Sequence, residues 1–302
     1  ESPLDIADAM RTRFLPQPQE SVDDDGWPAT REGLGRAWIF TSATLGHDAE
    51  LSWFVKRCGL ERARILRVPS PFDYAAQAAM YVPEDFPSPS DPRHGSAVAA
   101  LVANAAMSLS GRTLVLTTTL RAIAIIAQVL RQQLAQRGSH LDVLAQGEWP
   151  KLRLMERFRA GAGPQGGCIL VASASFWEGF DVPGDALQLV VIDKLPFPPP
   201  GDPLVEARTL QIEQSGGSAF KEYALAEAAV ALKQGAGRLI RHESDRGVLV
   251  VCDSRLVRMG YGKRLIAALP PMRRLSGAEE FHAALEDLAT ITRTSTTDQT
   301  FL

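Results

Sequence analysis

Two arginines and a glutamine stand at helical spacing in the segment QGAGRLIR, residues 234–241. On a helix, Gln234, Arg238 and Arg241 occupy positions i, i+4 and i+7, so their side chains share one face. A guanidinium group is permanently charged, and its planar fork matches the oxygens of a phosphate. We therefore expect this face to stabilise charge on a transferring phosphoryl group.

The same segment has a second interpretation as an exposed amphipathic helix. In that case its arginines pair at the surface with Glu243 or Asp245, and such pairs contribute little. Gly235 and Gly237 remove side-chain bulk and would let another surface approach closely. The spacing alone leaves both interpretations open.

A further polar segment, residues 173–184, directly follows the apolar run CILVA. Ser173 and Ser175 provide hydroxyl groups, and the backbone amides of a strand-to-helix turn can hold phosphates. Glu178 and Asp181 can receive ribose hydroxyls or arginines from elsewhere in the chain. Alternatively, the aromatic residues here belong to the core, and Asp181, which precedes Val-Pro, forms a turn.

Hydroxyl groups follow two more apolar runs. Thr41 and Ser42 come after WIF, and three threonines, 117–119, precede a helical pattern. Both groups are suited to binding phosphate at a helix N-terminus, or to serving as ordinary N-caps. His47 and Asp48 are expected to cap the helix that follows them.

Buried strands are predicted wherever a short β-branched run lies between longer helical patterns. The predicted strands are residues 38–42, 64–68, 113–117, 168–173, 187–193 and 247–253. Helical periodicity ending at glycine is found at residues 120–138 and 150–161. Alternating strands and helices predict an α/β fold with a parallel sheet covered by helices on both faces. Ligands then bind beyond the carboxyl ends of the strands.

The composition is that of an ordinary globular protein, with 45% hydrophobic and 22% charged residues among 302. A net charge of -3 neither supports nor excludes a nucleic-acid partner. Cys58, Cys168 and Cys252 are far apart and form no metal-binding pair. A cytoplasmic location is expected, because we find no membrane-spanning run and no signal peptide.

Taken in order, these segments resemble the later helicase motifs of superfamily 2. TSATL resembles motif III, LVLTTTLRA motif IV, SASFWEGFDVPG motif V and QGAGRLIRHESDRG motif VI. The likeness is to the XPD-like branch that includes the DinG and YoaA group, and it covers roughly residues 38–262. It implies a RecA-like fold, specifically helicase motor domain 2, and an ATP-dependent 5′ to 3′ DNA helicase of bacterial repair or replication.

The resemblance also implies roles for individual residues. Gln234, Arg238 and Arg241 would be catalytic and face the ATP phosphates, with both arginines acting as finger-type residues. The residues implied at the nucleotide are Gly237, Glu178, Gly179 and Asp181. The residues implied at single-stranded DNA are Thr117, Thr118, Thr119, Arg121, Ser173, Ser175, Thr41 and Ser42. Backbone phosphates are contacted without regard to base sequence, which suits a helicase.

Several parts of such a motor are not found in the sequence. It contains no G-x-x-x-x-G-K-[ST] loop, no D-E-x-H string and no four clustered cysteines. ATP and Mg²⁺ would therefore need a first motor domain to complete their site, and an iron–sulfur cluster is expected only in that part. We expect this chain alone not to hydrolyse ATP at a meaningful rate.

The chain begins at Glu1 rather than Met, which suggests a piece of a longer protein. We predict a remnant of the first motor domain at residues 1–45, ending in the motif III strand, a RecA-like domain at 46–275, and a C-terminal helix and tail at 276–302. The tail is either a disordered terminus or, by likeness to YoaA-type proteins, a docking segment for the χ subunit of the replicative DNA polymerase.

Two other functions are compatible with the sequence. A degenerate motor fold could survive only as a non-catalytic interaction module that binds a replication or repair partner. The missing nucleotide loop favours this interpretation, and the Gln234, Arg238 and Arg241 pattern opposes it. A metabolic α/β enzyme could use the turn at 173–184 for a phosphorylated small molecule.

Overall fold

The computed structural model describes residues 6–14, 38–42, 46, 48, 50–161, 167–173, 176 and 187–298. Its contacts divide the chain into two compact units. One comprises Glu1–Val68 together with Pro199–Ala226, and the other comprises Pro69–Pro198 together with Glu227–Leu302. The second unit contains the sheet and most of the residues to which the sequence assigns chemistry.

The regular elements in the described part of the first unit are helices and helical turns. Its elements are α1 (Ala7–Ala9), the π-helical turn η1 (Met10–Phe14), α2 (Ser52–Cys58), α7 (Pro203–Gln214), the π-helical turn η4 (Phe220–Ala224) and the start of α8 (Leu225–Ala236). The Asp202 carboxylate caps α7 by accepting hydrogen bonds from the backbone of Leu204 and Val205. At the start of α2 the N-cap position is Leu51, and the Asp48 carboxylate accepts the backbone N–H of Ser52, the first residue of the helix. His47, the other predicted cap, lies outside the described residues.

Among its described residues, the second unit contains a parallel sheet of seven strands in the order β3-β4-β2-β5-β6-β1-β7. The strands are β1 (Ala78–Tyr81), β2 (Thr113–Thr117), β3 (Asp142–Ala145), β4 (Cys168–Ser173), β5 (Leu189–Ile192), β6 (Gly247–Val251) and β7 (Arg273–Leu275). The central strands are fully buried, as expected for a sheet with both faces covered.

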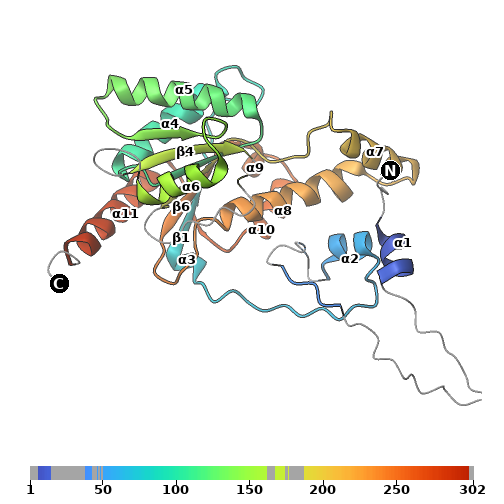
Figure 1. Cartoon of the computed structure of the whole chain (residues 1–302). Coiled ribbons are helices and arrows are strands. Elements are labelled where there is room, and N and C mark those ends of the chain that lie inside the picture. Colours follow the sequence, from blue (N-terminus) through green and yellow to red (C-terminus); the bar gives the residue numbers. More distant parts are fainter. Residues whose placement is uncertain are drawn as a thin grey trace, which may run out of the picture. The chain divides into compact units, whose positions relative to one another are not determined.

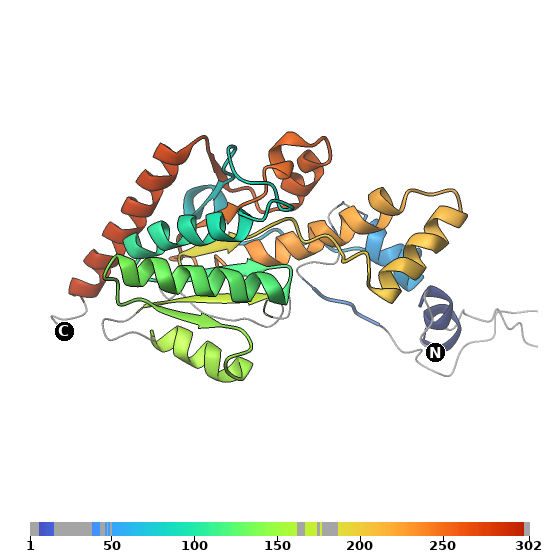
Figure 2. The ribbon, with the colours of Figure 1, turned by 90° about the horizontal axis from the view of Figure 1, so that it is seen from above.

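One face of the sheet carries α4 (His94–Ser108), α5 (Leu120–Gln136) and α11 (Ala278–Asp298), whose apolar side chains form a single core with the strands. Helices α4 and α5 lie side by side over the sheet (Figure 1). Helix α11 packs against α4 on this face (Figure 2). The Phe281 ring of α11 stacks on Tyr81 of β1. The C-terminal helix is therefore part of the core of the sheet unit.

The opposite face is covered by α6 (Lys151–Ala160) and by the segment that follows α8. Cys168 points away from the α5 side of β4, and its thiol lies 3.9 Å from the Phe158 carbonyl of α6. Leu239, just beyond α8, packs so closely on β6 that a Cβ on Gly247 would collide with it. The remaining short helices are α3 (Tyr74–Gln77), α9 (Arg255–Arg258) and α10 (Gly262–Ala268).

The predicted α/β class and the parallel sheet with helices on both faces are confirmed. Four predicted strands match β2, β4, β5 and β6, and two predicted helices match α5 and α6. Residues 38–42 and 64–68 are not strands, so the predictions there were wrong. Ile39 and Leu66 are exposed, at 84% and 87%. These β-branched runs have no neighbouring strand in the described structure, and strand propensity without a pairing partner does not form a sheet.

Three strands, β1, β3 and β7, were not predicted because they are short and carry little β-branched character. Helix α11 continues to Asp298, through most of the segment for which a disordered terminus was one expectation. None of the described helices combines the length and the apolar character needed to cross a membrane.

Candidate functional site

The arginines lie in a turn, residues 237–245, which we call the arginine turn. Helix α8 ends at Ala236, so Gln234 stands in its last helical turn while Arg238 and Arg241 lie beyond it. The predicted single helical face is therefore wrong. Glycine lowers helix propensity at 235 and 237, and the backbone N–H of Arg238 bonds to the carbonyl of Gly235 in a tighter turn. All three side chains are half-buried.

A buried carboxylate fixes the second half of the arginine turn. One oxygen of Asp245 accepts hydrogen bonds from the backbone N–H groups of Arg241 (2.7 Å) and His242 (2.8 Å). Asp245 is 5% exposed. It holds the end of the turn by accepting from backbone N–H groups. The alternative interpretation of the sequence had Asp245 pair with an arginine side chain at the surface.

Gln77, from the end of α3, holds the same turn from outside. Its side-chain nitrogen lies 2.9, 3.0 and 3.1 Å from the carbonyl oxygens of His242, Glu243 and Asp245. Gln77 directly precedes β1 and Asp245 closely precedes β6, so the arginine turn sits at the amino ends of these strands. A glutamine 165 residues away in sequence thus determines the path of the turn.

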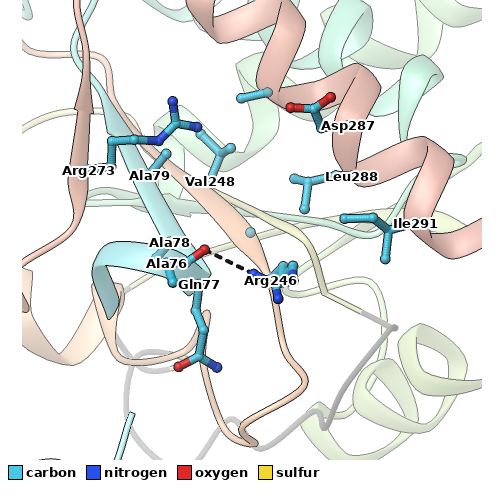
Figure 3. A pocket seen from close by; sticks show the side chains of 12 residues that line it. Ala76, Gln77, Ala78, Ala79, Arg246, Val248, Arg273, Asp287, Leu288 and Ile291 are labelled. Carbon is cyan, nitrogen blue, oxygen red and sulfur yellow. Dashed lines mark hydrogen bonds between the residues drawn. The ribbon is translucent and has the colours of Figure 1, made fainter. Parts of the chain in front are cut away.

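Next to Gln77 lies a cavity of about 450 Å³, between α11 and the first residues of β1, β6 and β7. Figure 3 shows Gln77 and Arg246 on its wall, with Arg246 bonded to the carbonyl of Ala76. Small residues, Ala78 and Gly247 among them, line the cavity at the first residues of β1 and β6.

The threonines of residues 117–119, which we call the threonine turn, lie at the opposite, carboxyl edge of the sheet. Thr117 donates to the carbonyl of Thr119 at 3.1 Å, and the Thr119 hydroxyl caps α5 by accepting from Ala122. Thr117 pairs in register with Ser173 of β4, so the two segments that resemble motifs IV and V meet at neighbouring strand ends. The Ser173 hydroxyl donates to the Gln146 side-chain oxygen at 3.0 Å.

The structure brings together only some of the predicted site residues. Gln234, Gly237, Arg238 and Arg241 gather at the amino edge, while Thr117, Thr118, Thr119 and Ser173 gather at the carboxyl edge. Arg121 is exposed on the first turn of α5. Thr41 and Ser42 are exposed in the other compact unit. Ser175, Glu178, Gly179 and Asp181 lie outside the described residues.

Two buried carboxylates at the carboxyl edge were not predicted. Asp193 follows β5 and is 2% exposed, and Asp253 follows β6 and is fully buried. The Asp253 carboxylate accepts from the backbone of Leu195 and pairs with the Arg255 guanidinium at 2.7 Å. The sequence held a signal for both, because LVVID and VLVVCD each end an apolar run on an aspartate.

Burial raises the pKa of Asp193 to about 7, and the nearby charge of Asp253 adds to this rise. Lys194 and the backbone N–H of Thr118 oppose it by stabilising the carboxylate. Burial also raises the pKa of the Cys252 thiol well above its ordinary value, so this cysteine is a neutral core residue. Within the described ranges, no group of three or more His, Cys, Asp or Glu side chains is placed to hold a metal ion.

Comparison with known proteins relates this arrangement to helicases. Residues 102–272 match the family described as Helicase C-terminal domain. The chain is 44% identical over 238 residues to the ATP-dependent DNA helicase YoaA of Escherichia coli K12, covering 79% of this chain and 36% of that protein. It is 38% identical over 255 residues to the ATP-dependent helicase DinG of Mycobacterium tuberculosis H37Ra, covering 83% and 37%.

A solved structure of an XPD helicase aligns with 66% of this chain and 36% of its own, at 17% identity and a TM-score of 0.47. The chain thus spans little more than a third of the length of the curated relatives it matches.

Proposed function

Because the chain belongs to the helicase C-terminal domain family, in its YoaA and DinG type, we propose that it is the second motor domain of an ATP-dependent DNA helicase. In the complete protein it would supply Arg238 and Arg241 to ATP and hold single-stranded DNA during 5′ to 3′ unwinding. The work of that protein would be DNA repair or replication.

The observation that carries this proposal is the anchoring of the arginine turn. A phosphate-binding arginine must be held in place before the reaction, because reorganising it in the transition state would cost part of the stabilisation. Asp245 and Gln77, both buried residues, bind five backbone groups of this turn. A surface turn with no task beyond solubility has no need of such an anchor.

The residues of this chain could bind the phosphates of ATP, but they do not make up a complete ATP-binding site. The arginine turn provides permanent positive charge, while the sequence has no phosphate-binding loop. Hydrolysis of ATP supplies the free energy for movement along DNA. Mg²⁺ and the β-phosphate would be held by a first motor domain, which is also where an iron–sulfur cluster would lie. We assign residues 1–45 to the end of that domain, 46–275 to the second motor and 276–302 to a C-terminal helix and tail.

The more exposed end of the threonine turn, at Thr118 and Thr119, and Ser173 would hold the backbone of single-stranded DNA, together with Arg121, Ser175, Thr41 and Ser42. The fully buried Thr117 would support the turn. Support comes from the register of Thr117 with Ser173, which places two hydroxyl-bearing motifs at adjacent strand ends. Gly237, Glu178, Gly179 and Asp181 would belong to the nucleotide side. The C-terminal tail would dock the χ subunit of the replicative polymerase.

The test is Arg238→Ala in the complete helicase. We expect DNA-stimulated ATP turnover to fall about 100-fold or more, with ATP affinity changed by only a few-fold, since a finger acts chiefly in the transition state. Arg258→Ala, which removes an exposed arginine of α9, is the matched control and should retain wild-type turnover. Unchanged turnover in Arg238→Ala would refute the assignment. The 302-residue chain by itself should show no DNA-stimulated ATPase.

A further inference from the structure

The carboxyl edge of the sheet continues beyond the threonine turn toward β3. In the strand order, β2 is followed by β4 and then by β3. Neighbouring strands lie about 4.8 Å apart, so the ends of β2 and β3 are separated by roughly 10 Å. Ser173 ends β4 between them. A DNA strand that is held by the threonine turn and Ser173, and that continues in this direction, next meets the residues that follow β3.

The residues that follow β3 form a turn, residues 146–149, which we call the tryptophan turn. The side-chain oxygen of Gln146 accepts hydrogen bonds from the backbone N–H of Ser173 at 2.7 Å and from its hydroxyl at 3.0 Å. The Glu148 carboxylate accepts from the Arg131 guanidinium at 2.7 Å and from the backbone N–H of Ala145 at 3.3 Å. Side-chain hydrogen bonds therefore hold the tryptophan turn in place and join it to Ser173.

Trp149 ends this turn and presents an aromatic ring at the surface. The residue is 38% exposed. The guanidinium carbons of Arg153 and Arg157 lie 4.1 and 5.5 Å from the centroid of its ring. Both arginines belong to α6, and they follow Trp149 by four and eight residues. These contacts bring positive charge to the ring, and aromatic rings and guanidinium planes are both surfaces on which nucleic-acid bases stack.

The helix that follows Trp149 is basic. Helix α6 carries four cationic side chains and one carboxylate, and it lies beside β4 (Figure 1). The amino group of Lys151, in its first turn, lies 5.1 Å from the ring of Phe176, three residues after Ser173. A basic surface with an exposed aromatic ring binds single-stranded nucleic acid without sequence preference, because cations attract phosphates and every base has a face that can stack.

We propose that Trp149 is a base-stacking residue for single-stranded DNA and that Arg153, which is exposed, contacts the phosphate backbone beside it. This rests on the proposed function, because it assumes that the strand passes the threonine turn and Ser173. Gln146 joins the tryptophan turn to Ser173, so a base on Trp149 is placed relative to the phosphate held at Ser173. The hydrogen bonds of the turn position the ring before DNA binds, which lowers the entropy lost on binding.

The test is the affinity of the complete helicase for two fluorescent strands, an oligo-dT and a strand of the same length with abasic sites. Trp149→Ala should bind oligo-dT about 10- to 100-fold more weakly than wild type and the abasic strand equally well, because only oligo-dT has bases to stack. Trp149→Phe keeps a ring and should retain most of the affinity. Leu152→Ala, which shortens an exposed apolar side chain of α6, is the matched control and should bind both strands as wild type does.

Arg153→Gln should weaken binding to both strands and make it less dependent on salt, because one phosphate contact is lost. Wild-type salt dependence in this variant would refute the phosphate contact. Equal affinity of Trp149→Ala and wild type for oligo-dT overturns the stacking role, and so does an equal loss on both strands, since an abasic strand has nothing to stack. A wild type that binds neither strand would instead refute the proposed DNA grip.

Discussion

Removing the side-chain donors of Gln77 tests whether the arginine turn is held from a distance. The Gln77 nitrogen has two protons for three carbonyl oxygens, and the residue is 6% exposed, with its bond to the Asp245 carbonyl buried. Gln77→Glu keeps the size but replaces the donors with an acceptor that repels the carbonyls, and Gln77→Leu removes polarity altogether. Two buried hydrogen bonds with unsatisfied partners left behind correspond to about 2–4 kcal/mol of unfolding free energy.

Urea unfolding of the 302-residue chain, followed by circular dichroism, measures this loss. We expect both variants to unfold at lower urea, with Gln77→Glu at least as destabilised as Gln77→Leu. In the complete helicase the same variants should also lose ATP turnover, because Arg238 and Arg241 lose their fixed backbone. Gln133→Leu on α5 is the control for loss of a glutamine amide away from the turn. Wild-type unfolding midpoints in both Gln77 variants would refute the reasoning.

Two further predictions concern the core and the buried carboxylate. Phe281→Ala should lower the unfolding free energy by about 3–5 kcal/mol, because the ring is buried and stacks on Tyr81 with 4.6 Å between the ring centroids. Ile291→Ala, on the exposed side of the same helix, is the control and should lower it far less. Equal effects of the two substitutions in urea unfolding would show that α11 is not part of the core. Because the pKa of Asp193 is raised to about 7 in the folded protein, its contribution to the free energy of unfolding is greatest at low pH and is lost as the pH rises from its unfolded-state pKa through neutrality. Asp193→Asn should therefore gain stability relative to wild type above about pH 7. A constant difference between the two proteins from acid to alkaline pH would contradict this.

Most of the sheet could be predicted from local patterns. TLVLT and CILVAS match β2 and β4 residue for residue, and Thr119 caps α5 where the helical pattern begins. Such signals are local because apolar runs and cap residues act on their own neighbours in the chain. The motif residues could also be found, since their types and order need no coordinates.

The end of α8 could not be predicted in this way. The spacing of Gln234, Arg238 and Arg241 suits a continuous helix, but the helix ends at Ala236, where the backbone N–H groups of Arg238 and Leu239 bond to carbonyls three residues earlier. Asp245 and Gln77 then hold the turn that follows. Residues 38–42 were predicted as a strand from their composition, but they form none, because no partner strand lies beside them in the described structure.

The sequence by itself determined the α/β class, four of the strands and the identity of the charged and hydroxyl-bearing residues. Only the tertiary structure decided that Asp193 is buried beside the threonine turn and that the arginines lie at the other edge of the sheet. The physical reason is that burial and hydrogen bonding between distant segments depend on which strands become neighbours. In this chain β5 and β6 are neighbours although more than fifty residues separate them.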